Sequence, residues 1–162
     1  MRKIIFIILL VAASVAAIAM PHKHKRKAGI DNHILSVSMR RTACYGRCPD
    51  YTVTINKDGT VTYYGRLFTD TGTFTKSLGY KKGQEIINEF YEYRVDTCSD
   101  VYEKRIADLP GVIFTVRYKT HTKTISNANF GPVFFTRLAT DMDNAGKKTD
   151  DTGWQKVPHP VK

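Results

Sequence analysis

The residues with the most distinctive chemistry lie between positions 41 and 51. Two cysteines, Cys44 and Cys48, enclose three residues there, and Pro49 follows at once. In an oxidising compartment two cysteines this close favour a disulfide, whose small ring would hold the loop in one shape. Cys98 is the third cysteine of the chain, so it makes other pairings available. The spacing favours a Cys44–Cys48 disulfide, with a pairing of Cys98 to either one as the alternative.

The same cysteines are the starting point for three reactive alternatives. Redox sites of the thioredoxin type use Cys-x-x-Cys at a helix start, whereas this spacing is one residue longer and lies between predicted strands. A zinc site would combine the three cysteines with His121, but the metal-ligand spacing occurs only once. An enzyme site would use Cys98 as nucleophile and His121 as base, with Asp100 and Asp108 in the same connection. Each alternative is weaker than a structural disulfide, and no cofactor or metal is predicted.

Arginines and tyrosines cluster around the cysteine loop. An arginine fork binds carboxylate or phosphate through paired hydrogen bonds, and it also stacks on aromatic rings. The candidate binding residues are Arg40, Arg41, Tyr45, Arg47, Tyr51 and Arg66. Ordinary exposed charge that protects a sheet edge is the competing interpretation. If the protein recognises a ligand, this group is the predicted surface.

The segments on both sides of the loop predict strands, because apolar and polar residues alternate along them. Lys57-Asp58-Gly59 is typical of a hairpin turn. Six strands are expected, at residues 34–42, 51–55, 60–67, 73–78, 111–118 and 123–126. The connection from 96 to 110 lacks a period and is interpreted as irregular. The cysteine loop would then join the first two strands.

Two segments instead repeat their apolar residues at three- and four-residue spacing. Residues 84–95 predict an amphipathic helix. Gly131-Pro132 is expected to open a second helix, which Asn144-Ala145-Gly146 ends. The order of elements, ββββαββα, predicts an α+β domain over 34–146: an antiparallel sheet with both helices on one face. A polar tail, 147–162, follows and contains Trp154.

The N-terminal segment resembles a targeting signal. A short positive start and an apolar run from Ile4 to Ala19 predict a signal peptide over residues 1–19. Residues 20–33 form a basic linker, and its basic residues could touch anionic lipid. These are Lys23, Lys25, Arg26 and Lys27. We expect an exported protein, periplasmic or secreted; an uncleaved N-terminal anchor is the alternative, because basic flanks oppose translocation.

Composition agrees with one domain, and the positive net charge favours anionic partners, with a charge that only aids solubility as the competing interpretation. The chain has 162 residues, 42% of them hydrophobic, and its 25 Lys and Arg outnumber its 15 Asp and Glu for a net charge of +10. No nucleophile elbow, phosphate loop, zinc-protease helix or dinucleotide fingerprint is present in the sequence. We therefore expect a non-enzymatic binding module for an envelope protein or an anionic surface component, and nucleic acid is not the expected partner.

A longer pattern begins at the cysteine loop. It consists of Cys44, Gly46, Cys48, Pro49, Tyr51, Asp58, Gly59, Tyr63 and Gly65, with weaker matches at Tyr102 and Asp108-Leu109-Pro110. With its Cys-x-Gly-x-Cys-Pro-x-Tyr core, this pattern resembles a family of bacterial secreted or envelope domains of unknown function. The resemblance covers most of residues 34–143. It implies an exported domain with the two cysteines together, and it implies no activity or catalytic residue.

Overall fold

The structure is a computed structural model that describes residues 33–104, 109–148 and 153–158. The expected signal peptide and the four basic residues of the linker lie outside these ranges, and so does Asp108. The described residues form an α+β domain, as the sequence predicts. All strands belong to one eight-stranded sheet, which is antiparallel except at one edge.

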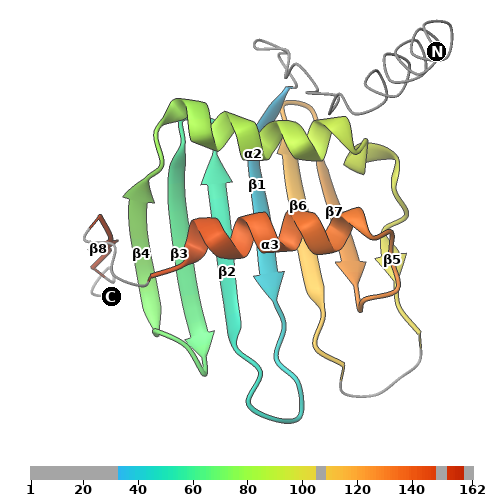
Figure 1. The fold of residues 1–162 in the computed structure, drawn as a ribbon, viewed down its shortest axis with the longest axis horizontal. Coiled ribbons are helices and arrows are strands. Elements are labelled where there is room, and N and C mark those ends of the chain that lie inside the picture. The colour runs from blue at the N-terminus through green and yellow to red at the C-terminus, as the bar shows by residue number, and fades with distance from the viewer. Residues whose placement is uncertain (1–32, 105–108, 149–152, 159–162) are drawn as a thin grey trace, which may run out of the picture. The chain divides into compact units, whose positions relative to one another are not determined.

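Six strands make up the body of the sheet, and two short ones complete its edges. They are β1 (Ile34–Arg41), β2 (Asp50–Asn56), β3 (Thr60–Leu67), β4 (Gly72–Ser77), β5 (Val101–Tyr102), β6 (Val112–Tyr118), β7 (Thr122–Asn127) and β8 (Gln155–Lys156). Their order across the sheet is β5-β7-β6-β1-β2-β3-β4-β8. β1 therefore lies at the centre, between β2 and β6, as Figure 1 shows.

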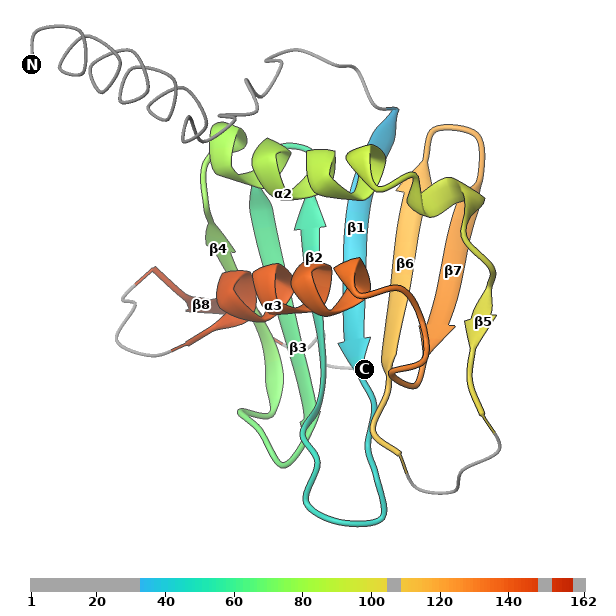
Figure 2. The ribbon, with the colours of Figure 1, turned by 45° about the vertical axis from the view of Figure 1, so that its right-hand side comes forward.

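Within the described residues, the α-helices α2 (Tyr80–Glu92) and α3 (Phe134–Gly146) cross the same face of the sheet. Figures 1 and 2 show both helices in front of the strands, which confirms the predicted arrangement. The rings of Tyr93 and Phe134 stack at 4.7 Å where the end of α2 meets the start of α3. The opposite face, which we call the open face, carries no helix of the described chain.

The core lies between the helices and the sheet. Phe114 contacts Phe90 of α2 at 5.8 Å and Phe135 of α3 at 5.5 Å between ring centroids, so one strand residue joins both helices. Fully buried apolar side chains surround these rings: Val37, Met39, Val53, Ile55, Val116, Ile87, Leu138 and Met142. The alternation of the strands places serines and threonines on the open face, where Ser38 and Thr54 hydrogen bond across β1 and β2 at 3.0 Å.

Both predicted helices are present, but their boundaries differ from the predicted ones. The first helix begins at Tyr80 rather than at residue 84, and it ends at Glu92, beyond which Arg94 adopts a left-handed backbone with φ of 52°. Gly83 is compatible with the helix because it packs on the β2–β3 turn, where an added Cβ would lie 2.6 Å from the Cα of Gly59. The second helix begins at Phe134, so Pro132 precedes it.

Two short strands were not predicted from the sequence, because segments of two residues are too short to show an alternation of apolar and polar residues. β5 lies in the connection predicted to be irregular, and it pairs in parallel with β7. β8 lies in the polar tail and pairs with β4. Next to β8, the Trp154 ring packs edge-on against Tyr63 at 6.2 Å. The alternation of buried and exposed residues is also interrupted at the start of β1. The pairing of β1 with β6 shifts register between Ile34 and Ser36, where Ile34 is completely buried and Leu35 is half-buried.

One end of the sheet collects the segments that matter for function. β1, β3 and β7 end there, and β2, β4 and β6 begin there. We call it the disulfide end, and it comprises residues 42–49, 67–71, 109–111 and 128–131. In both views these segments lie at the lower end of the sheet.

Candidate binding site at the disulfide end of the sheet

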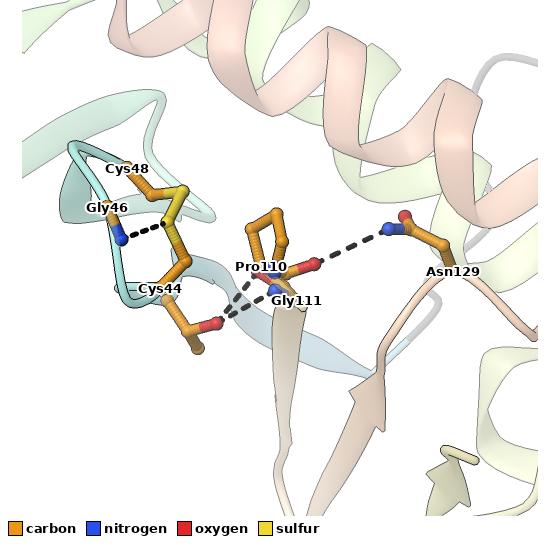
Figure 3. Close-up of a disulfide and its surroundings, with 7 residues drawn as sticks. Cys44, Gly46, Cys48, Pro110, Gly111 and Asn129 are labelled. Carbon is orange, nitrogen blue, oxygen red and sulfur yellow. Dashed lines mark hydrogen bonds between the residues drawn. A yellow bond between two sulfur atoms is a disulfide. The ribbon is translucent and has the colours of Figure 1, made fainter. Parts of the chain in front are cut away.

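The loop from β1 to β2 is closed by a disulfide between Cys44 and Cys48, whose Cα atoms lie 5.4 Å apart. The spacing of the sequence favoured this pair, and Cys98 is a free thiol. The backbone N–H of Gly46 donates to Sγ of Cys44 at 3.3 Å, inside the ring that Figure 3 shows. A ring this small acts locally, because it removes little chain entropy from the unfolded state.

The base of the loop is attached to the start of β6. The backbone N–H of Thr42 donates to the carbonyl of Gly111 at 3.0 Å, and the N–H of Gly111 donates to the Thr42 hydroxyl at 2.9 Å. Asn129 donates to the carbonyl of Pro110 at 3.4 Å (Figure 3). The loop is thus fixed at its base and closed by the disulfide. Its tip projects outward, since the side chain of Tyr45 is 92% exposed and Arg47 is exposed beside it.

The predicted arginine–tyrosine group is divided between the two faces of the sheet. Successive side chains of a strand point to opposite faces, so Arg40 and Arg41 cannot share one. Arg40 joins Arg66 around Asp50, whereas Arg41 joins Tyr51 around Asp143 on the helix side. The structure therefore brings the candidates together in two clusters, with the loop tip between them.

The first cluster, which we call the arginine bracket, consists of Arg40, Asp50 and Arg66. The carboxylate of Asp50 accepts two hydrogen bonds from Arg40, from Nη2 at 2.8 Å and from Nε at 3.1 Å. It accepts a third from Nη1 of Arg66 at 3.0 Å. Hydrogen bonding to Arg40 holds the pKa of Asp50 below its usual range, and the charge of Arg66 contributes. Two cations therefore share one ionised carboxylate, which leaves the cluster with a net positive charge.

Further contacts hold the Arg66 side of the bracket. Nη1 of Arg66 also donates to the Thr52 hydroxyl at 2.9 Å, and its guanidinium lies 4.5 Å from the centroid of the Tyr64 ring. The Asp50 side chain is only 9% exposed, whereas those of Arg40 and Arg66 are 42% and 31% exposed. The carboxylate is thus covered, and parts of both guanidiniums face solvent.

The second cluster joins the sheet to α3. Asp143 accepts a hydrogen bond from Nη2 of Arg41 at 2.5 Å and another from the Tyr51 hydroxyl at 2.6 Å. Burial raises the pKa of Tyr51 above its ordinary value, and the hydrogen bond to Asp143 adds to this shift. The Tyr51 ring stacks on Tyr63 at 5.3 Å. These contacts give the cluster a structural role, because they join β1, β2 and the last turn of α3.

A cleft of about 590 Å³ opens beside this cluster. Its lining residues are Pro49, Tyr51, Tyr63, Thr69, Asp70, Asp143, Asn144, Gly146, Lys147 and Lys148. Most of its charges are already paired: Lys148 lies 3.2 Å from Asp70, and Asp143 accepts from Arg41. The ammonium of Lys148 also lies 3.0 Å from the centroid of the Phe74 ring. The cleft is therefore a weaker site for a charged ligand than the bracket on the open face.

The residues of the enzymatic alternative have other contacts. Lys123 lies 2.5 Å from Asp100 and donates to the carbonyl of Cys98, while the His121 ring stacks on Tyr118 at 4.5 Å. Burial raises the pKa of the Cys98 thiol, which is the opposite of the shift that activates a nucleophile. In the described part of the chain, no group of three or more His, Cys, Asp or Glu residues could hold a metal ion.

Sequence reasoning missed the two carboxylates that organise the clusters. Asp50 directly follows the Cys-Pro step, and strand alternation across the hairpin could have placed it on the face of Arg40. Asp143 gave no such signal, because 102 residues separate it from Arg41. Only the packing of α3 on the sheet brings them together.

The fold and the site define a class: a one-sided α+β domain whose central hairpin loop is closed by a disulfide. A family model described as Domain of unknown function (DUF6438) matches residues 35–146, and the chain belongs to that family. No curated protein matches the chain. In the described residues, no helix is both long enough and apolar enough to span a membrane.

Proposed function

We propose that this protein is an exported, non-enzymatic binding module that recognises an anionic group of an envelope partner through the arginine bracket. One observation carries the proposal: two part-exposed guanidiniums converge on a covered carboxylate on the open face of the sheet. The ligand would be a carboxylate or a phosphate, because these are the groups whose oxygens match an arginine fork.

The geometry supports binding because the arginine side chains are already ordered. A free arginine loses much rotamer freedom when it binds, and this loss weakens binding. Here Asp50 orients both guanidiniums, and Thr52 and Tyr64 hold the second. Arg40 directs Nε and Nη2 to Asp50, and Arg66 directs Nη1 to it. Nη1 of Arg40, and Nε and Nη2 of Arg66, supply donors for an incoming anion.

Export is part of the proposal. The sequence of residues 1–19 has the features of a signal peptide, and a disulfide such as Cys44–Cys48 persists in oxidising compartments. We expect the mature protein to begin at Met20, and mass spectrometry of protein purified from its native host will check this. A mature chain that keeps Met1 would contradict cleavage and support the N-terminal anchor instead.

The binding test replaces both arginines. The double variant Arg40→Gln/Arg66→Gln should bind at least about tenfold more weakly, because two or more charge-assisted hydrogen bonds are lost and each 1.4 kcal/mol corresponds to tenfold. Binding is measured by biolayer interferometry to immobilised polyglutamate and to immobilised polyphosphate, with uncharged dextran as the blank. A preference for one polymer identifies the anion as carboxylate or phosphate.

Two controls separate the bracket from charge in general. Arg94→Gln/Arg117→Gln removes the same charge from exposed residues outside the bracket and should leave binding nearly unchanged. Arg40→Lys/Arg66→Lys keeps the charge but removes the forks, and it should bind almost as weakly as the glutamine variant. Urea unfolding of every variant verifies folding. Equal losses in the Arg94/Arg117 control, or full binding by the lysine variant, would contradict the proposal.

A further inference from the structure

Exposed apolar side chains gather at the disulfide end, although they come from separate segments of the chain. Tyr45 is 92% exposed, Phe68 53%, Leu67 48%, Leu109 38% and Phe130 37%. They belong to the cysteine loop, the end of β3 and the turn after it, the segment before β6 and the segment after β7. Figure 1 shows these four segments side by side along the lower end of the sheet. We call these five side chains the apolar row.

Basic residues accompany the apolar row. Arg47 is exposed next to Tyr45 in the cysteine loop, and the ammonium of Lys104 lies 4.9 Å from the centroid of the Phe130 ring. Among the carboxylates that the structure describes here, Asp70 is paired with Lys148 at 3.2 Å, and Glu103 accepts a hydrogen bond from Ser126 and keeps its negative charge. The row is therefore flanked by positive charge, on a chain whose net charge is +10.

We propose that the disulfide end inserts its apolar row into the headgroup region of an anionic lipid membrane. Aromatic and aliphatic side chains flanked by Lys and Arg are the composition that this interface favours, since rings settle at headgroup depth and cations meet lipid phosphates. Between β3 and β7 the row spans four strand spacings, roughly 19 Å at about 4.8 Å each. A row of separate protruding side chains suits a plane, whereas a peptide ligand needs a groove.

The disulfide has a specific part in this arrangement. An exposed tyrosine on a free loop would fold back onto apolar surface, whereas the closed ring and its base at Thr42 and Gly111 keep Tyr45 pointing away from the domain. The same attachment orients the molecule. With the disulfide end on the membrane, the open face with its arginine bracket would stand at an angle to the lipid and stay accessible to a partner.

Site-directed tryptophan fluorescence tests the proposal in the full-length chain. Trp154 is the only tryptophan of the protein, so Trp154→Phe provides a silent background. In that background Tyr45→Trp and, separately, Phe68→Trp report on the disulfide end. We expect a blue shift and strong quenching of both by vesicles of brominated phosphatidylglycerol, and much smaller changes with brominated phosphatidylcholine. Because quenching reports the position of one residue, binding through the N-terminal segment does not imitate it.

Tyr80→Trp is the matched control. Tyr80 is 63% exposed but starts α2 next to the β2–β3 turn, at the other end of the sheet, so its emission should stay unquenched. Arg47→Gln/Lys104→Gln, combined with Tyr45→Trp, should lower the fraction quenched on phosphatidylglycerol. Unquenched emission from both disulfide-end variants, or equal quenching at Tyr80, would overturn the proposal. A concentration-dependent dimer without quenching would assign the row to contact between two copies and overturn it as well.

Discussion

Replacing Gly59 with alanine is expected to lower the free energy of unfolding by about 2–5 kcal/mol. Gly59 has φ of +86°, a left-handed conformation that costs other residues about 1–2 kcal/mol. Its added Cβ would also lie 2.4 Å from the carbonyl oxygen of Gly79, and forced packing of this kind costs about 1–3 kcal/mol more. Since small domains are stable by about 5–15 kcal/mol, the loss could remove much of the native state.

The crowding at Gly59 arises because the start of α2 rests directly on the β2–β3 turn. The N–H of Leu78 donates to the carbonyl of Gly59 at 3.0 Å, and Gly83 packs on it from the first turn of the helix. Gly79→Ala is the matched control, because Gly79 has a similar φ of +78° but no atom within 4 Å of its added Cβ. The control lacks this close contact and should carry only the conformational cost, about 1–3 kcal/mol for a backbone with φ of 78° and ψ of 150°. Equal losses by urea unfolding would refute the close approach.

Asp143→Ala should destabilise the domain by about 2–3 kcal/mol, the scale of hydrogen bonds to a charged group. The substitution leaves the half-buried Arg41 and the Tyr51 hydroxyl without the acceptor that joins them to α3. Asp141→Ala, on the same helix, removes a long contact to Arg137 at 4.0 Å and an interaction with the Glu89 carboxylate, and should change stability by no more than about 1 kcal/mol. Urea midpoints compare the two variants, and equal effects would count against the cluster as a structural joint.

The same cluster gives a pH dependence with a definite sign. The pKa of Tyr51 is raised in the folded protein from an ordinary value of 10.0, by burial and by Asp143. A group whose pKa is higher in the folded than in the unfolded protein stabilises the fold fully at a pH below its unfolded-state pKa. This stabilisation is lost as the pH rises through its folded-state pKa. Unfolding should therefore become easier from about pH 10 upward. In Asp143→Asn the ultraviolet titration of Tyr51 should move to lower pH, and an unchanged titration would exclude the contribution of Asp143.

The spacing of apolar residues predicted an element and its bounds correctly where the same spacing continues through the whole segment. The β3 strand has its predicted bounds, 60–67, because alternation runs through it without interruption. The first helix was recognised by type but placed late, since the packing that accommodates Gly83 involves a turn more than 20 residues earlier. β5 and β8 are two residues each, and so short a segment has no period to read.

The candidate site was also predicted only in part from the sequence. Arginine chemistry identified Arg40 and Arg66 as candidates, and the Cys44–Cys48 spacing identified the closed loop beside them. The single predicted patch nevertheless became two clusters, because neighbouring strand residues face opposite sides of the sheet. The apolar row was not predicted as a group, and Tyr45 was the one member named among the candidate binding residues. Its members are scattered from Tyr45 to Phe130, and the strand order alone brings their segments to one end.

The amino-acid sequence by itself determined the class of fold, the order of the main elements and the closed loop at the centre of the sheet, because periodicity and cysteine spacing act over short distances along the chain. Only the tertiary structure decided what surrounds that loop. It placed Asp50 between Arg40 and Arg66, and it brought Asp143 to Arg41 from 102 residues away. Such contacts depend on strand order and helix packing, which bring distant residues together without leaving a local pattern in the sequence.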